Sequence, residues 1–124
     1  MDDERLDALV TTAFDVMGVV SRVAAAHDLS LTQLRVLAIL RDRTPRMSEL
    51  ATYLGLDRSS LTGLIDRAVA RGLLQRVPDA TDSRAIRVAL TAAGRDLAAT
   101  GAEEIRAGVS ELAVLAPPPG DEHM

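Results

Sequence analysis

The sequence GLDRSSLTGLIDRAVARGLLQRV at residues 55–77 decides the predicted fold, because it places one helix between two glycine stops. Gly55 ends a preceding short helix, Asp57 is a favourable N-cap, and Gly72 ends the helix expected from residue 58 to about residue 71. The apolar residues of this helix form one continuous stripe: Leu61, Leu64, Ile65, Ala68 and Val69. Their helical spacing predicts that this side packs on a core.

The opposite face of the same helix is small and polar. At about 100° per residue it holds Ser59, Thr62, Gly63, Asp66 and Ala70. Gly63 would cost about 1 kcal/mol relative to alanine in a helix interior. A DNA major groove about 12 Å wide admits a helix whose short side chains allow close approach to the base edges. We predict that this face contacts DNA; an ordinary solvated face is the alternative.

The neighbouring segments extend this pattern. The β-prone runs LLQRV and RAIRVAL flank the turn-rich PDATDS, which predicts a β-hairpin directly after the helix. Before the helix, Pro45 lies in a turn, and Ser48 is the expected N-cap of the short helix that Gly55 ends. Two helices joined by a tight turn and followed by a hairpin predict a winged helix-turn-helix.

Longer helices are predicted on both sides of this region. Apolar residues at helical spacing predict an amphipathic helix over about the first 27 residues, and Ser30 with Gln33 has the spacing of a capping box before the next helix. Thr91 is the expected cap of a final helix. Three glycines are expected to interrupt that helix: Gly94, Gly101 and Gly108. The predicted fold class is mainly α, a winged helix-turn-helix with a two-stranded β wing and flanking N- and C-terminal dimerisation helices.

These elements predict one domain over residues 1–116 and a disordered tail over residues 117–124. Residues 1–28 and 91–116 are expected to form the dimerisation helices, and residues 30–90 the DNA-reading part. The first helix has an apolar stripe: Leu6, Leu9, Val10, Ala13, Phe14 and Met17. A stripe of this size is unfavourable in water, so we predict a homodimer that buries it.

Charge is divided unevenly along the 124 residues, whose net charge is −4. Residues 41–95 carry ten arginines and six acids, whereas both flanking segments are net acidic. The basic middle marks this segment as the docking site of an anionic partner. All fourteen basic residues are arginines; arginine suits phosphates and base edges, but a biased genome would give the same composition.

Specific DNA contacts follow from the helix face and the hairpin. On the helix we predict Arg58, Ser59, Ser60, Thr62, Gly63 and Arg67; on the hairpin we predict Arg76, Asp82, Ser83, Arg84 and Arg87. Arg84 near the hairpin tip suits a narrow minor groove, and Asp82 is placed to hold its guanidinium. Asp66 would repel phosphate unless it accepts from a cytosine amine or neutralises a neighbouring arginine, and we favour the second role.

Several other classes of protein fit the sequence poorly. The chain has no cysteine, which excludes disulfides and thiolate metal sites, and its two histidines have no catalytic or metal-ligand spacing. We therefore predict no enzyme activity, no cofactor and no metal. The acidic start lacks the basic region of a secretory signal, and no apolar run approaches the roughly 18 residues of a membrane span. A cytoplasmic location is predicted.

At this point the sequence resembles the MarR family of winged-helix transcriptional regulators. The resemblance rests on LTQLRVLAIL, MSELATYLGLDRSSLTGLIDRAVARGLLQRV, PDATDSRAIRVALT and LTAAG, in that order. It implies a homodimer with intertwined terminal helices, whose two winged domains straddle a pseudo-palindromic operator, and we expect a repressor. The chain departs from the family pattern at Ser83, where the wing usually has a second arginine. It also departs in its short C-terminal end.

The resemblance also implies a small anionic or phenolic effector that binds between the dimer helices and the DNA-reading part. The polar residues placed near that junction are Arg22, His27 and Arg43. His27 is alternatively a helix cap. A different class of function stays open: a winged-helix module that acts through protein–protein contacts without binding DNA, which the net negative charge would suit. Salt dependence separates the two, because phosphate contacts weaken steeply as salt rises.

Overall fold

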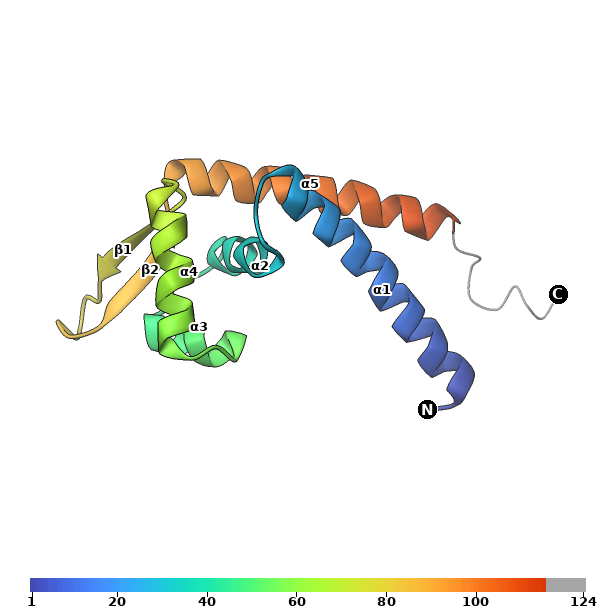
Figure 1. Ribbon diagram of the computed structural model, residues 1–124, viewed down its shortest axis with the longest axis horizontal. Helices are drawn as coiled ribbons and strands as arrows, with labels where there is room; N and C mark the ends of the chain where they lie inside the picture. Colours follow the sequence, from blue (N-terminus) through green and yellow to red (C-terminus); the bar gives the residue numbers. More distant parts are fainter. Residues whose placement is uncertain (116–124) are drawn as a thin grey trace. The chain divides into compact units, whose positions relative to one another are not determined.

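The computed structural model describes residues 1–115 and divides into two compact units (Figure 1). The winged unit comprises residues 32–100, and the helical unit comprises residues 1–31 with the chain from residue 101 onward. The last helix, α5 (Ala92–Leu115), contributes its first part to the winged unit and the rest to the helical unit. The predicted disordered tail at residues 117–124 lies outside the described residues.

The winged unit has the predicted order of elements. It contains α2 (Leu31–Leu40), α3 (Met47–Leu54), α4 (Arg58–Ala70), β1 (Leu74–Pro78) and β2 (Ile86–Leu90). The two strands pair antiparallel, with Arg76 opposite Val88. The fold is therefore the mainly α, winged helix-turn-helix class expected from the sequence. Its core is aliphatic and includes the side chains of Val36, Leu37, Leu50, Leu61, Ile65 and Val88, which are at most 2% exposed.

Helix ends in the winged unit mostly match the sequence signals. Asp57 caps α4, and its carboxylate accepts from the backbone N–H of Ser60 at 2.7 Å. Gly55 and Gly72 have φ angles of 68° and 76°, in the left-handed region that glycine favours. The prediction that Ser48 caps α3 is wrong. The N-cap is Arg46, and the helix begins at Met47, two residues earlier than expected, because Glu49 reaches back to accept from the N–H of Arg46 at 2.8 Å.

The loop between α2 and α3 bonds directly to the wing. Val88 of β2 donates its N–H to the carbonyl of Pro45 at 2.9 Å, and Arg46 and Arg87 form an isolated antiparallel bridge. Pro45 cannot donate a backbone hydrogen bond but still accepts one, so it can lie beside a strand edge. Strand β2 of the wing is thus bonded to the loop before α3 as well as to its partner strand β1.

Gly94 and Gly108 of α5 are sites of close packing, and the expectation that the glycines interrupt the helix is wrong. The helix is continuous from Ala92 to Leu115, and Thr91 caps it by accepting from the N–H of Gly94 at 3.0 Å. A Cβ on Gly94 would lie 1.9 Å from the carbonyl oxygen of Leu73, and one on Gly108 would lie 2.6 Å from Val19. Glycine is used here because neighbouring elements approach the α5 backbone.

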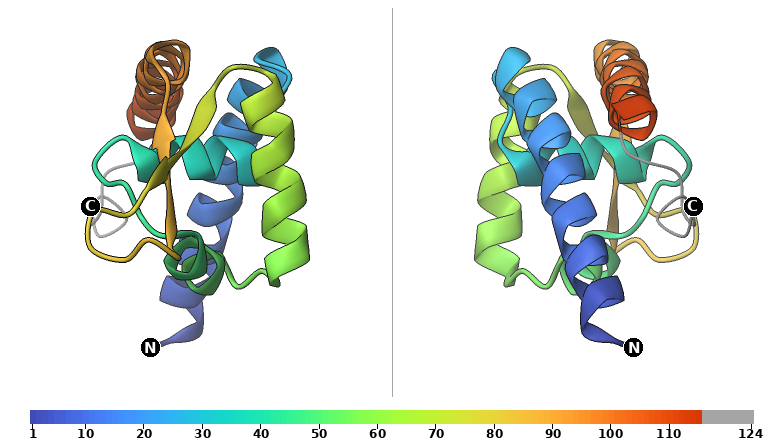
Figure 2. Two further views of the ribbon diagram at one scale, coloured as in Figure 1. Left: turned by 90° about the vertical axis from the view of Figure 1, so that its left-hand side faces the viewer. Right: turned by 90° about the vertical axis from the view of Figure 1, so that its right-hand side faces the viewer.

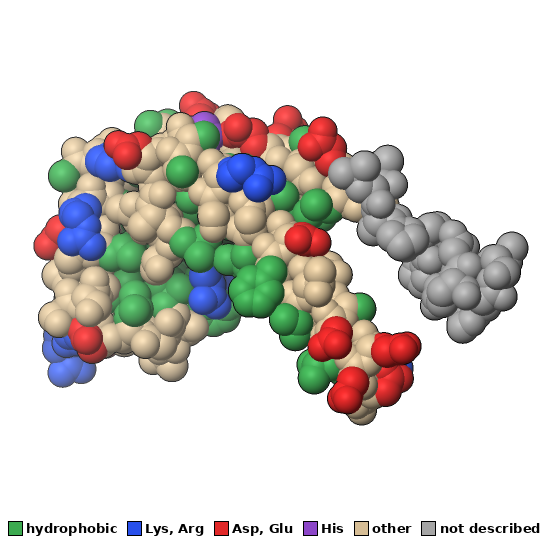
Figure 3. Space-filling model, turned by 45° about the vertical axis from the view of Figure 1, so that its right-hand side comes forward, with side chains coloured by type: hydrophobic (Ala, Val, Ile, Leu, Met, Phe, Trp, Pro, Cys, Tyr) green, Lys and Arg blue, Asp and Glu red, His purple; other side chains and the backbone are tan. Residues whose placement is uncertain are grey.

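In the helical unit, α1 (Asp3–Ala26) buries only its C-terminal half. Val19, Val23 and Ala24 are buried, whereas the earlier apolar residues are exposed: Leu6, Leu9, Val10, Phe14 and Met17. Figure 3 shows hydrophobic side chains along the exposed half of α1 and acidic side chains at its N-terminal end. The exposed stripe is the one on which the predicted homodimer depends.

One property of α1 differs from expectation. By length and composition it is long and apolar enough to cross a membrane, with a mean hydropathy of 1.5 over 18 residues. The prediction from the sequence that no apolar run approaches the length of a membrane span is therefore wrong for α1. One such helix is weak evidence for a membrane segment, because core helices of water-soluble proteins can be equally long and apolar.

Candidate nucleic-acid interface

The exposed face of α4 carries the short polar residues expected from the sequence. Ser59 and Ser60 are exposed, and Thr62 and Gly63 are half-buried. The Thr62 hydroxyl donates to the carbonyl of Arg58 at 2.8 Å, which leaves its oxygen lone pairs available as acceptors. The Ser59 hydroxyl donates to Asp57 at 2.8 Å. Hydrogen bonds from the Ser60 backbone and the Ser59 side chain lower the pKa of Asp57, so the cap stays ionised.

A hollow of about 580 Å³ lies between this face and the wing. We call it the wing hollow; it is lined by Arg46, Met47, Ser48, Arg58, Thr62, Asp82, Arg84, Ala85 and Ile86. Its lining comes from the start of α3, from α4 and from the hairpin, which the left view of Figure 2 shows together. Three arginines against one aspartate line it, which suits a phosphate backbone.

The hairpin tip presents Arg84 to solvent. Its side chain is 92% exposed, and its Nε lies 3.5 Å from Asp82 Oδ1. The same Asp82 oxygen accepts the Arg84 backbone N–H at 3.0 Å. The predicted contact between Asp82 and Arg84 is therefore present, and it orients the arginine without burying it. Ser83 lies between them and is also exposed.

Asp79 organises the base of the wing. Its carboxylate is 1% exposed and accepts from Nε of Arg46 at 2.7 Å and Nε of Arg87 at 3.0 Å. It also accepts from the backbone N–H of Thr81 at 2.8 Å and of Asp82 at 3.2 Å. These hydrogen bonds hold the pKa of the Asp79 carboxyl well below its usual range, and the bond from the Thr81 backbone N–H has the largest effect. The roles of Asp79 and Arg46 are not evident from the sequence, because Arg46 and Asp79 are 33 positions apart along the chain.

Two arginines predicted to contact DNA have partners within the protein. Arg87 donates from Nη1 to the carbonyl of Thr44 at 2.7 Å as well as to Asp79. Arg76 pairs with Asp66 at 2.5 Å, which is the neutralising role expected for that aspartate. For Arg87 this bonding points to a role in positioning the wing, and direct DNA contact by Arg76 or Arg87 stays a prediction. Arg67 is exposed on α4.

The three predicted effector residues are divided between the two units. Arg43 belongs to the winged unit, whereas Arg22 and His27 belong to the helical unit. His27 is the C-cap residue of α1, as the alternative interpretation held, and its ring pairs with Glu104 of α5. Arg43 lines a separate pocket, within the winged unit, together with residues of α2, α3 and β2.

Comparison with known proteins agrees with this geometry. A family model described as "MarR family" matches residues 27–85, from the end of α1 through the wing. The crystal structure of RV1404 from Mycobacterium tuberculosis superposes with a TM-score of 0.81 and 28% identity, covering 96% of this chain and 83% of that one. The chain is therefore similar to the MarR family over residues 27–85, and its fold matches that of solved MarR structures.

Other similar proteins carry more specific descriptions. An uncharacterised HTH-type transcriptional regulator, YfiV of Bacillus subtilis, is 35% identical over 65 residues; the match covers 52% of this chain but only 41% of that protein. A MarR variant of E. coli complexed with operator DNA superposes with a TM-score of 0.69 and 25% identity, covering 87% and 76% of the two chains. NadR in complex with 4-hydroxyphenylacetate gives a TM-score of 0.76 and 25% identity, covering 88% and 79%.

Proposed function

We propose that this chain is a DNA-binding transcriptional regulator of the MarR type, a repressor that binds a pseudo-palindromic operator as a homodimer in the cytoplasm. The wing hollow is the observation that carries this proposal, because it brings Arg46, Arg58 and Arg84 together beside the small polar face of α4. Unrelated segments of the chain supply these arginines, so their convergence is a property of the fold. A related MarR variant has been crystallised with operator DNA, which supports the same use of the fold.

The geometry suggests a division of roles between the groove and the backbone. Helix α4 would enter the major groove, with Thr62 and the Gly63 backbone nearest the base edges. Arg46 and Arg58 line the hollow beside that helix, where a phosphate backbone would pass. Arg84, exposed at the wing tip, would enter the neighbouring minor groove or pair with its phosphates.

The homodimer rests on the exposed stripe of α1. Leu9 is 56% and Phe14 73% exposed in the single chain, and both lie on the half of α1 that its own chain does not cover. Soluble proteins rarely leave such a row of large apolar side chains in water, and a second copy of the same helix is the simplest cover. A two-fold dimer would present two winged units to the two half-sites of an operator.

Release of DNA by a small effector completes the proposal. NadR has been crystallised with 4-hydroxyphenylacetate, a small phenolic acid, which supports an effector of that class. The candidate polar contacts remain Arg22, His27 and Arg43, divided between the two units. A ligand acts as an effector only if it binds the DNA-free state more tightly than the DNA-bound state.

Selection of bound sequences from random duplex DNA tests the main proposal. We expect an enriched, two-fold symmetric motif, and an affinity that falls steeply between about 50 and 200 mM salt. The control is a variant with Arg46, Arg58 and Arg84 all changed to glutamine, which should enrich no motif. If the parent enriches nothing at low salt, the protein-binding winged module becomes the better description.

A further inference from the structure

A long side chain lies across the middle of the small polar face of α4. Arg67 follows Gly63 by one helical turn, and side chains on a helix lean toward its N-terminal end. A Cβ on Gly63 would lie 3.4 Å from Nη1 of Arg67, so the guanidinium lies over the glycine. Gly63 therefore leaves room on the exposed face for a planar cation that comes from the next turn of the helix.

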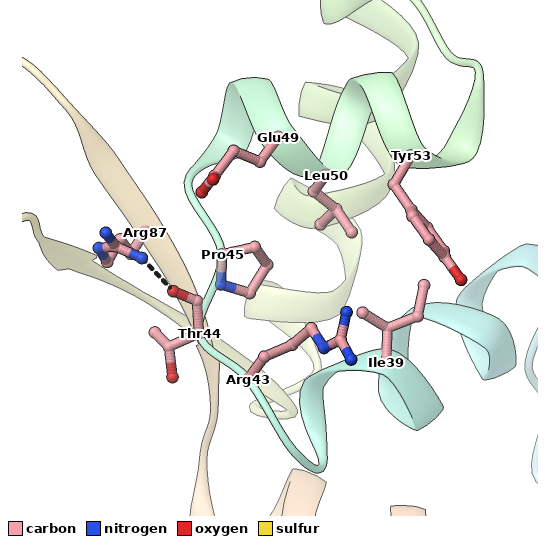
Figure 4. A pocket seen from close by; sticks show the side chains of 8 residues that line it. All are labelled: Ile39, Arg43, Thr44, Pro45, Glu49, Leu50, Tyr53 and Arg87. Carbon is pink, nitrogen blue, oxygen red and sulfur yellow. Dashed lines mark hydrogen bonds between the residues drawn. The ribbon is translucent and has the colours of Figure 1, made fainter.

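The charge of Arg67 is available to a molecule outside the chain. Arg67 is exposed, and among the residues that the structure describes its side chain makes no ion pair. The neighbouring carboxylate of Asp66 is paired with Nη2 of Arg76 at 2.5 Å. Arg87 is also held within the protein, because its Nη1 donates to the carbonyl of Thr44 (Figure 4). Arg67 thus differs from Arg76 and Arg87 in having its guanidinium free for a ligand.

The short side chains of the same face offer hydrogen-bond acceptors. The Thr62 hydroxyl donates to the carbonyl of Arg58 at 2.8 Å, and the Ser59 hydroxyl donates to Asp57 at 2.8 Å. A hydroxyl has one proton, so in this arrangement both can only accept from a DNA base. Acceptors suit the amines of adenine and cytosine, whereas guanine presents two acceptors, N7 and O6, in the major groove. Recognition of a guanine therefore needs a donor that these two hydroxyls do not supply.

The two arginines within α4 project from opposite sides of the helix. Arg58 and Arg67 are nine positions apart, which at about 100° per residue places them about 180° apart. Arg58 lines the wing hollow with Thr62 and Arg84, where the phosphate backbone is proposed to pass. Arg67 does not line that hollow, and its guanidinium lies over Gly63 instead. The donor for a base edge is therefore Arg67.

We propose that Arg67 recognises a guanine in each half-site of the operator, with its planar guanidinium donating to O6 and N7, and that Gly63 gives it the room to do so. The inference rests on the proposed function and names a base that the α4 face selects. A bidentate pair of this kind discriminates against a wrong base by about 5- to 150-fold. A phosphate contact by Arg67 is the alternative, and it would add affinity on every sequence alike.

Selection from random duplex DNA by the parent and by variants separates these two roles. The parent motif should contain a guanine in each half-site. Arg67→Ala and Arg67→Gln should lose the preference at that position and keep it at the others. Arg58→Ala is the matched control: it should weaken binding on all duplexes and keep the guanine preference. Because the Arg67 side chain is exposed and has no ion pair, its variants should keep the Tm of the parent.

Base analogues then test the contact atom by atom. Replacing the selected guanine with 7-deazaguanine removes N7 and should lower the affinity of the parent about fivefold or more, with no further loss in Arg67→Ala. Inosine keeps N7 and O6 and lacks only the minor-groove amine, so the parent should bind it as it binds guanine.

Four results would each overturn the inference and leave the proposed function in place. They are a parent motif without guanine, a guanine preference that survives in Arg67→Ala, a loss in Arg67→Ala that is equal on every duplex, and equal effects of 7-deazaguanine on parent and variant. A parent that enriches no motif would reject the proposed function, and this inference with it.

Discussion

Arg46, the residue before α3, and Asp79, the residue after β1, form an ion pair of 2.7 Å although 33 residues separate them in the chain. The pair fixes the start of α3 to the base of the wing, and Arg87 joins the same carboxylate from β2. Because Arg46 also lines the wing hollow, Asp79 orients one of the arginines proposed to contact DNA.

Loss of the Asp79 charge should loosen the wing without unfolding α4. We expect Asp79→Asn to lower Tm by several degrees and to weaken DNA binding, since the amide cannot accept from both arginines and from Thr81 together. Asp42→Asn, at an exposed loop position, is the matched control and should change neither quantity. Equal Tm and equal DNA affinity for parent and Asp79→Asn would show that the ion pairs are dispensable.

The same carboxylate predicts how stability depends on pH. Its pKa is lower in the folded than in the unfolded chain, so its ionised form stabilises the fold. This contribution is fully present above the ordinary aspartate value of about 4 and is lost as pH falls toward the folded value. The Tm difference between the parent and Asp79→Asn should therefore stay constant from about pH 5 to 8 and shrink below about pH 4. A difference that grows on acidification would contradict this assignment.

Thr62 should specify a base within each half-site. Thr62→Ala removes a hydrogen-bond acceptor from the α4 face and should alter the preference at one position, by about 1–3 kcal/mol if the contact is direct. The measurement is competition binding against every single-base variant of the selected operator. An unchanged preference profile would place Thr62 outside the set of base contacts.

Arg84 should contribute charge to DNA binding from the wing tip. Arg84→Ala should reduce the slope of log affinity against log salt by about one unit if the side chain neutralises a phosphate. If it enters the minor groove, the loss should instead depend on the A·T content beside each half-site. Arg41→Ala serves as the control for removing an exposed arginine. Unchanged affinity on every duplex would reject both roles for Arg84.

Two glycine substitutions should have opposite effects on stability. Gly63→Ala should stabilise the free protein by up to about 1 kcal/mol, since its nearest neighbour is the flexible Arg67 tip, 3.4 Å from the added Cβ. The same change should weaken DNA binding if the α4 backbone approaches the bases. Gly94→Ala should destabilise the fold by about 3 kcal/mol or more, because the Cβ would overlap the Leu73 carbonyl. Thermal unfolding with and without operator DNA checks both changes.

The homodimer predicts a definite mass in solution. Sedimentation at micromolar concentration should give about twice the chain mass of 13.2 kDa. Leu9→Asp combined with Leu112→Asp should give a monomer that loses operator affinity and keeps a folded winged unit, whereas Ser21→Asp, at an exposed polar position of α1, should remain dimeric. A monodisperse, well-folded parent monomer would rule out the α1 stripe as a dimer surface.

The local features of this chain were predictable because neighbouring residues decide them. The positive φ angles of Gly55 and Gly72 and the cap at Asp57 follow from residue types that lie beside the helix ends they control. The antiparallel pairing of β1 with β2 follows from two β-prone runs around a turn. These signals, in that order, were enough to predict the winged helix-turn-helix and the exposed face of α4.

Tertiary structure decided the features that depend on residues distant in sequence. Asp79 looked like a turn residue, and only the folded wing places it between Arg46 and Arg87. The glycines of α5 have poor helix propensity, but Gly94 lies against the Leu73 carbonyl, so packing outweighs a local preference worth about 1 kcal/mol. A buried charge and a close backbone approach are both set by partners that local sequence does not specify, because their energies come from the folded environment rather than from the residue itself.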